Sequence, residues 1–448
     1  MAGGILVFAL LPEDPKDGPA QRGAGAEAPN SPTPPAGQTT PPPGPTTASA
    51  GTDLALKEET FAVVRQLMED FPDSSDPIGM MGTLYNHYGN TAEAVNWWLK
   101  CLQQDPKRAD VYHGLGMVAM AKGEYEKAEE LWRKAQGINP NLPGVWGRYA
   151  EALMEMGKLD VALAALHNEI RISPRKPGNY VLLGKVHLQR KEYEEAIAAY
   201  TKAAEIQPRQ SAVYYGLATA STRLGRTGQA AKYMERFTKL RAEENKAVTK
   251  RRRAAVTGTH RAKILARTLT DAGRLYADGR RARKAEECWQ RAASLVPGHT
   301  RCRQQLVLLY MNTQREEQAV AVCEQLRKID PQDPTTCVNM GVLLARLKRF
   351  DAAEGAVREA IRLAPKRPSP YRALVQVLLM GDRKLPEAKA LARKLVALSP
   401  TAGDYGLLGE ACQRAGDPAG AVAARRRAAE LARSGAADQR TRRGPPQR

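Results

Sequence analysis

From residue 75 onward, small and large apolar residues of this chain recur with a period of about 34 residues. In most periods a Gly or Ala is followed twelve residues later by an Ala, and in most of them a large side chain stands four residues further on. Two antiparallel helices pack closely only where small residues meet at their crossing point. A proline closes most periods, and proline cannot continue a helix. The pattern therefore predicts a series of helix-turn-helix units and no sheet.

The closing prolines fix the number and the register of these units. They form two series with steps of 34 or 35 residues: Pro106, Pro140, Pro174 and Pro208, then Pro297, Pro331, Pro365 and Pro400. The interval between the two series is 89 residues, which equals two periods plus 21. We therefore expect ten units, which start near Ser75, Ala109, Pro143, Pro177, Ser211, Ala266, Thr300, Pro334, Pro368 and Ala402.

The second unit carries the full set of repeat residues. These are Tyr112, Leu115, Gly116, Gly123, Tyr125, Ala128, Trp132, Ala135 and Pro140. The set resembles the tetratricopeptide repeat (TPR) family, whose unit is a 34-residue helix-turn-helix, and the chain is similar to the multi-repeat scaffolds of bacterial type. The resemblance covers residues 75–433. It implies an all-α fold, a right-handed superhelical solenoid of about ten repeats in two arrays.

The domain organisation follows from where the repeat is interrupted. Residues 1–52 are expected to be a short apolar start and a disordered Pro/Thr-rich linker, because their composition cannot bury enough apolar surface to fold. Residues 53–244 should hold a capping helix and units 1–5, and residues 266–433 should hold units 6–10. A basic connector over 245–265 would separate the two arrays. Residues 434–448 would form a disordered basic tail.

The net charge of +20 lies entirely in the second half of the chain. Residues 1–244 contain 27 Lys and Arg against 29 Asp and Glu, whereas residues 245–448 contain 41 against 19. An excess of one sign favours acidic partners, which could be acidic protein segments, nucleic acid or an anionic membrane surface. An Arg-rich composition that only aids solubility is the alternative.

The connector holds the densest group of positive charge. Eight basic residues and no acidic residue lie between Lys246 and Arg267. The candidate anion contacts are Lys250, Arg251, Arg252 and Arg253. Basic clusters neutralise phosphates, but the segment has no aromatic residue on which a base could stack. A solvated hinge, a contact with an acidic protein, and a contact with nucleic acid or membrane therefore stay open, as does the choice between a rigid helix and a hinge.

The apolar stretch at residues 5–11 bears on localisation. It is too short to span a membrane, and it lacks the basic leader of a signal peptide. It could be the end of a truncated export signal or membrane anchor, and only such an anchor would give the chain a membrane partner. An exported or membrane-tethered protein and a cytoplasmic protein both fit this sequence.

The resemblance implies that the first helix of each unit lines a concave ligand groove. Outward positions on these helices are 2, 5, 9, 12 and 13 of each unit. In the first array they include the candidate partner-binding residues His113, Met117, Met120, Glu151, Met154, Lys185 and Tyr215. Methionines with a few polar residues suit an adaptable peptide-binding groove.

In the second array the same positions are rich in arginine. The candidates are Arg267, Arg274, Arg301, Arg346, Arg372 and Arg414. Guanidinium groups can form forked hydrogen bonds to carboxylates, so we expect this array to bind proteins with acidic segments. Chaperone-binding members of the family hold a C-terminal carboxylate with a Lys/Asn/Arg clamp. That set is missing from consecutive units, so a chaperone tail is not expected.

Catalytic and metal motifs are missing from the sequence. It has no HExxH, GxSxG, P-loop or GxGxxG motif in a fitting context, and its six histidines and six cysteines show no metal-binding spacing. We expect no enzyme activity, no cofactor and no metal, and free thiols with Cys101 and Cys323 facing the core.

Two functions fit these observations. The first is a non-catalytic protein–protein interaction scaffold that binds peptide segments or partner proteins in the concave grooves. The alternative is a nucleic-acid-associated repeat protein that acts through the basic segment 246–267 and the C-terminal tail.

Overall fold

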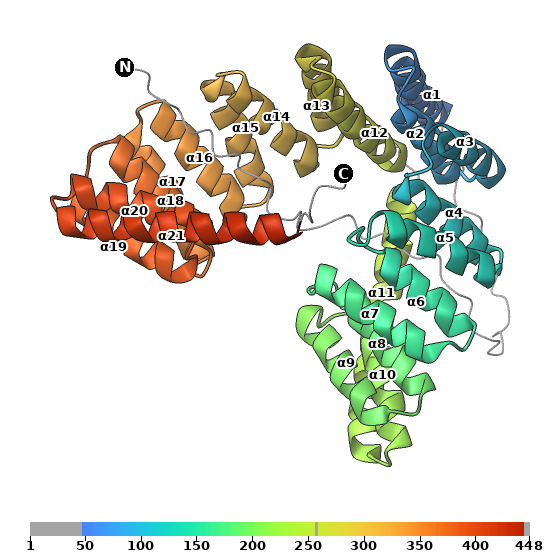
Figure 1. Ribbon diagram of the computed structural model, residues 1–448. Coiled ribbons are helices and arrows are strands. Elements are labelled where there is room, and N and C mark those ends of the chain that lie inside the picture. The colour runs from blue at the N-terminus through green and yellow to red at the C-terminus, as the bar shows by residue number, and fades with distance from the viewer. Residues whose placement is uncertain (1–46, 256–258, 443–448) are drawn as a thin grey trace, which may run out of the picture. The chain divides into compact units, whose positions relative to one another are not determined.

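The computed structural model describes residues 47–255 and 259–442, with side chains from 53 to 248 and from 260 to 433. Every element within these ranges is a helix, and successive helices pair into hairpins (Figure 1). We call the first helix of each pair helix A and the second helix B. The fold is an α-solenoid of helix-turn-helix repeats, which confirms the predicted fold class.

The first array has five helix pairs. They are α2 (Ser75–His87) with α3 (Thr91–Gln104), α4 (Ala109–Ala121) with α5 (Tyr125–Ile138), α6 (Val145–Glu155) with α7 (Leu159–Ile172), α8 (Pro177–Gln189) with α9 (Tyr193–Ile206), and α10 (Ser211–Arg223) with α11 (Thr227–Ala255). Helix B has 14 residues in the first four pairs, whereas α11 has 29. The fifth unit has Ala242 where units 1–4 and 6–9 have the closing proline, so no proline stops its helix B at the usual place.

The second array also has five helix pairs. They are α12 (Thr259–Asp278) with α13 (Ala282–Leu295), α14 (Thr300–Asn312) with α15 (Glu316–Ile329), α16 (Pro334–Arg346) with α17 (Phe350–Leu363), α18 (Pro368–Met380) with α19 (Leu385–Leu398), and α20 (Ala402–Arg414) with α21 (Pro418–Arg442). Helix α12 has 20 residues, whereas the other helices A of this array have 13. Within the expected connector, residues 245–255 thus continue α11 and residues 259–265 begin α12, while 256–258 lie outside the described residues.

The turn between helix A and helix B needs one residue in the left-handed region. Gly89 (φ 80°) and Gly123 (φ 76°) supply it at little steric cost. At the same repeat position Lys191 (φ 63°) and Lys348 (φ 60°) adopt this conformation although they are not glycines. The hairpin geometry is therefore set by the packing of the two helices, and glycine only makes the turn easier to form.

Close packing of glycine on a large ring explains the alternation of small and large residues. A Cβ atom on Gly116 would lie 2.7 Å from Nε1 of Trp132, and one on Gly273 would lie 2.3 Å from Nε1 of Trp289. Both tryptophan side chains are buried. All six cysteines are free thiols, and all except Cys288 are buried.

Helix α1 (Thr47–Asp70) packs on unit 1 and on unit 6 at once, beside α2 and α12 (Figure 1). Toward unit 1, Phe61 joins a core cluster with Met81 and Leu84 of α2. Toward unit 6, Leu67 belongs to the core cluster that runs through the second array. The sequence predicts a capping helix from residue 53 that covers the first repeat. The helix in the structure begins at Thr47 and covers the sixth repeat as well.

Polar contacts give the direction of α1 relative to α12. Asp53, early in α1, lies 3.7 Å from Arg261 at the start of α12. Asp70, at the end of α1, accepts a hydrogen bond of 2.6 Å from the hydroxyl of Tyr276 near the end of α12. These two helices therefore run parallel.

Other junctions between units have the opposite direction. Glu286, in the first half of α13, pairs with Arg315, which directly follows the turn after α14, at 2.6 Å. Helix B of one unit thus runs antiparallel to helix A of the next. Helix α1 takes the place of a preceding helix B on α12 but in reverse direction, because α11 makes no contact of comparable extent with α12 among the described residues.

The contact between Asp70 and unit 6 makes stability depend on pH. The hydrogen bonds from Lys284 (2.7 Å) and Tyr276 hold the pKa of Asp70 at about 2, below its ordinary value of 3.8. Because the folded-state pKa is lowered, this stabilisation is present above about pH 4 and is lost as the pH falls toward about 2.

Asp70→Asn is therefore expected to lower the free energy of unfolding at pH 7, measured by urea titration. The difference from the parent chain should narrow as the pH falls below about 4. The control is Asp73→Asn, since Asp73 is exposed in the turn that follows α1 and has no ion pair among the described contacts. An Asp70→Asn chain as stable as the control would show that this contact does not hold α1 in place.

Candidate partner-binding surface

Successive helices A contact one another within each array. Such contacts join α4 to α6, α6 to α8 and α8 to α10 in the first array, and α12 to α14, α16 to α18 and α18 to α20 in the second. Successive helices B of the described chain have no contact of comparable extent. We call the side formed by the helices A the helix-A face of each array. The candidate partner-binding residues of the sequence lie on these helices.

The methionine and glutamate candidates of the first array are partly engaged in packing. Met117, Met120 and Met154 lie half-buried against the core cluster of units 2 and 3. Glu151 pairs with Arg148, one turn earlier in α6, at 2.7 Å. These side chains line the helix-A face but do not stand free of it.

Lys185 and Tyr215 are the exposed candidates of the first array. Lys185 lies on α8 and has no ion pair among the described contacts. Tyr215 is 54% exposed, and its ring packs 5.3 Å from the ring of Phe237 in α11. The structure therefore places Tyr215 at the end of the first array, next to α11, the helix B of unit 5.

His113 is held inside its repeat. The indole Nε1 of Trp132 donates a hydrogen bond of 3.0 Å to Nδ1 of His113. Since Nδ1 is an acceptor here, the ring is neutral and carries its proton on Nε2. Burial lowers the pKa of His113 to about 4, and the positive charges of Arg148 and Lys176 add to this effect.

The imidazole of His113 is therefore expected to titrate near pH 4, well below the ordinary value of 6.5. Because the pKa of His113 is lower in the folded chain, the unfolded chain binds the proton first as the pH falls. The free energy of unfolding therefore decreases between about pH 6.5 and pH 4. NMR titration of the histidine ring signals would show this, with His113→Gln identifying the signal. A His113 signal with its midpoint near pH 6.5 would contradict the buried, Trp132-bonded ring.

Several arginines of the second array join one unit to the next. They stand at the same repeat position, just before helix B, and each pairs with an acidic residue of the preceding helix B. The pairs are Arg315 with Glu286, Arg349 with Glu317, and Arg383 with Asp351. In unit 6 the residue at this position is Arg281, which pairs with Asp70 of α1 at 2.9 Å.

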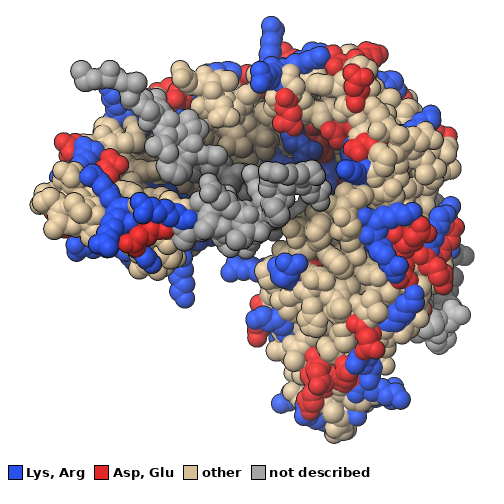
Figure 2. All heavy atoms as spheres, in the orientation of Figure 1, with Lys and Arg blue, Asp and Glu red and all other residues tan. Residues whose placement is uncertain are grey.

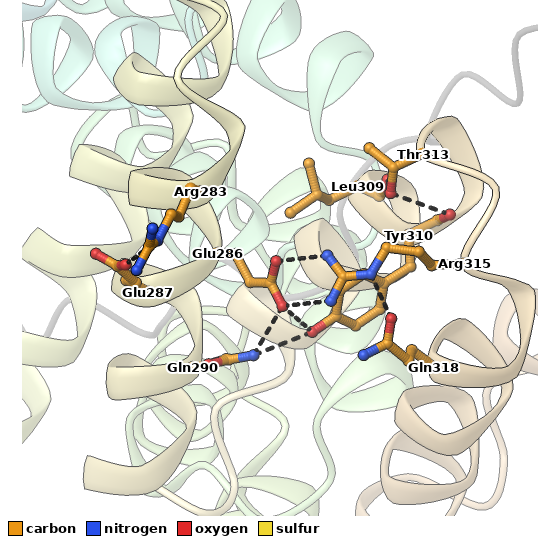
Figure 3. A network of polar contacts seen from close by, with 9 residues as sticks. All are labelled: Arg283, Glu286, Glu287, Gln290, Leu309, Tyr310, Thr313, Arg315 and Gln318. Carbon is orange, nitrogen blue, oxygen red and sulfur yellow. Dashed lines mark hydrogen bonds and ion pairs between the residues drawn. The ribbon is translucent and has the colours of Figure 1, made fainter.

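Figure 3 shows the junction between units 6 and 7. The Arg315 guanidinium makes two hydrogen bonds to the Glu286 carboxylate, of 2.6 and 2.8 Å, and stacks over the ring of Tyr310. The Tyr310 hydroxyl donates to the same carboxylate at 2.8 Å. Hydrogen bonding to Arg315 lowers the pKa of Glu286, which is therefore ionised at neutral pH. Arg283 and Glu287 form a separate pair that is mostly exposed.

Glu286→Ala should destabilise the chain by about 1–3 kcal/mol, because it leaves the half-buried Arg315 and the buried Tyr310 without the carboxylate that accepts their hydrogen bonds. The matched control is Glu287→Ala, one residue away, whose exposed pair should contribute less than about 0.5 kcal/mol. Both values come from urea unfolding curves. Equal effects of the two substitutions would mean that the Glu286 network does not stabilise the junction.

Two of the arginine candidates also serve contacts between units. Arg372 makes a forked contact with the buried carboxylate of Asp404, at 2.7 and 3.0 Å. Arg414 donates to the carbonyl oxygen of Leu379 at 2.7 Å and to Asp382 at 2.9 Å. Both guanidinium groups are occupied within the array, so they are poor candidates for a partner.

Four arginine candidates are more accessible. Arg267 and Arg274 of α12 and Arg346 of α16 are exposed, and none has an ion pair or hydrogen bond among the described contacts. Arg301 is half-exposed and lies 3.6 Å from Asp271. Among the six candidates, Arg267, Arg274 and Arg346 are therefore the guanidinium groups for which the described part of the chain shows no partner.

Basic and acidic side chains are interspersed over the face drawn in Figure 2. This agrees with the many ion pairs between neighbouring units, such as Arg226 with Glu194. The positive excess of the second half therefore does not form one broad basic surface on this face. The backbone of Lys250, Arg251, Arg252 and Arg253 belongs to α11, but their side chains lie outside the described residues.

Sequence reasoning missed the residues that tie the units together. The signal was present, because Arg281, Arg315, Arg349 and Arg383 follow one another at intervals of 34 residues. Their acidic partners stand at two different repeat positions, which hid the pairing. The role of Asp70 had no such signal, because it lies outside the repeats.

Neither a membrane helix nor a metal site emerges from the described ranges. No helix there is long and apolar enough to cross a bilayer. No group of three or more His, Cys, Asp or Glu side chains is placed there to hold a metal ion.

Four repeat-family models match segments of the sequence. One, described as TPR repeat, matches residues 184–225. Three described as tetratricopeptide repeat match residues 109–142, 270–334 and 334–367. These segments fall within both arrays, and the match at 109–142 spans α4 and α5. No curated protein matches the sequence.

Several solved structures are similar over part of the chain. The crystal structure of MamA is 23% identical, covers 37% of this chain and 97% of its own, and has a TM-score of 0.35. MamA from Desulfovibrio magneticus RS-1, from residue 41 to its end, is 18% identical and covers 38% of this chain and 96% of its own, with a TM-score of 0.36. YrrB, described as a TPR protein with an unusual peptide-binding site, is 15% identical and covers 42% of this chain and 97% of its own, with a TM-score of 0.37.

Stacked helix hairpins with exposed helix-A faces define the class of the protein, a repeat scaffold for protein–protein interaction. The helix pairs and the four family matches agree on the repeat unit, so the identification does not depend on the partial structural similarities. The chain is a tetratricopeptide-repeat protein. Scaffolds of this family are generally not enzymes.

Proposed function

We propose that this scaffold binds acidic segments of partner proteins on the helix-A face of the second array. The observation that carries the proposal is the exposure of Arg267, Arg274 and Arg346 without ion pairs among the described contacts. Most other arginines on the helices of this array are paired with acids of their own or a neighbouring unit. A free guanidinium group surrounded by paired ones is available to a carboxylate from outside.

The spacing of two of these arginines suits an extended peptide. Arg267 and Arg274 are seven residues apart in α12, which places them two turns apart on one side of the helix, roughly 10 Å along its axis. In a polyproline II segment, residues three apart lie on the same side at about 9 Å. Acidic residues at every third position of such a segment could therefore reach both guanidinium groups.

The same surface is less suited to single-stranded nucleic acid. Single-strand binders usually stack bases on exposed aromatic rings. The large hydrophobic side chains exposed in the described part of the second array are Met380, Leu398 and Val422, none of which is aromatic. An acidic protein segment therefore fits this face better. In the first array, the half-buried methionines next to exposed polar residues suit a more apolar peptide.

The test uses the full chain and a fluorescein-labelled peptide of twelve residues, with Glu at every third position and Pro and Ser between. Arg267→Glu combined with Arg274→Glu should weaken binding at least tenfold, measured by fluorescence anisotropy at 50 mM salt. The control combines Arg283→Glu and Arg327→Glu, which make the same change of charge at exposed positions on helices B. The control should bind within twofold of the parent chain.

Equal weakening in both double variants would show that only net charge matters and would count against the helix-A face. A twelve-nucleotide single strand of DNA serves as the second ligand. DNA that binds more tightly than the peptide, and is lost with the α12 variant, would favour the nucleic-acid function.

A further inference from the structure

One repeat position is buried in every unit that has a following neighbour and exposed in unit 5. It is the position four residues after the recurring Ala of helix B, which holds a large side chain in most units. In units 1–4 and 6–9 its exposure is at most 4%, for Trp98, Trp132, Leu166, Tyr200, Trp289, Cys323, Val357 and Ala392. In unit 5 this residue is Met234, which is 41% exposed.

Met234 is exposed because none of the described helices packs on α11 at this place as the next helix A. In unit 4 the ring of Tyr200 lies against Gly216 of the next helix A, where an added Cβ atom would be 2.3 Å from the ring. Helix α12, which would be the next helix A after α11, packs instead on α1 and α13 (Figure 1). The exposed residues Tyr215 and Met234, together with the half-buried Phe237 whose ring packs on that of Tyr215, form what we call the unit-5 end face.

The three other ends of the arrays are built differently. Helix α1 covers α2 at the start of the first array and α12 at the start of the second. At its far end, unit 10 has Arg425 at the position of Met234, and Val422 is flanked by Arg426 and Glu430. A terminal repeat needs a polar outer face to stay in solution. Unit 10 meets this requirement at the equivalent position, whereas unit 5 has methionine there, so its end face is suited to be covered.

Unit 6 of the same chain is a poor occupant of this face. At the junctions described above, the preceding helix B offers Glu286 or Glu317 to the arginine of the next unit. At the corresponding positions unit 5 has Ala231 and Gly228, which cannot accept a hydrogen bond from a guanidinium group. The arginine of unit 6 already finds its acid in α1.

The charges beside the end face indicate what would cover it. Arg241 lies seven residues after Met234, and Arg223 lies eight residues after Tyr215, so helical spacing places each arginine on the side of its apolar partner. Both arginines are exposed; Arg241 lies 4.0 Å from Glu244 of its own helix, whereas Arg223 has no ion pair among the described contacts. Two copies of this face would bring like charges together, which disfavours self-association through it.

We propose that the unit-5 end face docks an amphipathic helix of a partner protein whose apolar stripe is flanked by acidic residues. The contact of α1 with unit 6 shows this chemistry within the chain. There Leu67 enters the core of the array, while Glu59 pairs with Arg291 at 3.0 Å and Asp70 pairs with Arg281. This site lies in the first array, so the inference does not depend on the proposed arginine site of the second.

The test uses the full chain and two designed helical peptides of 22 residues with the same leucine stripe, one flanked by Glu and one by Lys. Fluorescence anisotropy should show binding of the Glu peptide, with affinity at least tenfold lower for the Lys peptide. Met234→Glu should lower the affinity for the Glu peptide at least tenfold. Val422→Glu makes an equal change of charge at a 66%-exposed residue of unit 10, and it should leave the affinity for the Glu peptide within twofold of the parent chain.

Three results would overturn the proposal. They are no binding of the Glu peptide by the parent chain, equal affinity of the parent and Met234→Glu chains, and a dimer in sedimentation velocity that Met234→Glu abolishes. The last would make a second copy the occupant. If the circular dichroism of the Met234→Glu chain differs from the parent, Met234→Ser replaces it, with the same expected direction. Arg267→Glu with Arg274→Glu should keep the affinity for the Glu peptide, which separates this site from the second-array site.

Discussion

The packing of α1 on α12 is the contact on which the order of the two arrays depends. In a solenoid each unit is stabilised mainly by its neighbours, so an interruption leaves one array without a successor and the next without a predecessor. Helix α1 supplies the missing predecessor through Leu67 in the core and Asp70 in the ion pairs of Arg281 and Lys284. Because the same helix packs on α2, both arrays begin at one shared helix. The stability of unit 6 is therefore linked to residues about 200 positions earlier in the sequence.

Ion pairs between units explain why three of the six arginine candidates, in a chain with such a positive excess, already have a carboxylate partner. The position before helix B holds an arginine at four consecutive junctions, and its guanidinium group forms an ion pair with a carboxylate of the preceding helix at each of them. A pair that is half-buried and hydrogen-bonded, as at Glu286, contributes more than an exposed pair. These arginines thus help to fix the register between units. Arg267 and Arg274 differ from them because they have no partner among the described contacts.

The repeats could be predicted because periodicity is a local signal that is summed over ten units. The positions of Gly116 and Trp132 within one unit follow from helix packing alone, and the structure confirms the all-helical repeat fold. The candidate site could be predicted only as a set of helices. Whether an arginine on helix A is free depends on residues of the next unit, as Arg372 shows by its contact with Asp404. The docking of α1 joins segments far apart in the sequence, and no spacing within the chain indicates it.

The two proposed sites both favour a negatively charged partner, but they bind it by different interactions. The helix-A face of the second array offers free guanidinium groups with little apolar surface, so affinity there should come from charge and fall with salt. The unit-5 end face offers Met234 and Phe237 beside Arg241, so the larger part of its affinity should come from burial of apolar area. A partner with an acidic helix and an acidic extended segment on one chain could occupy both. Its second contact would then form at the effective concentration set by its linker, and modest affinities at each site would combine into firm attachment.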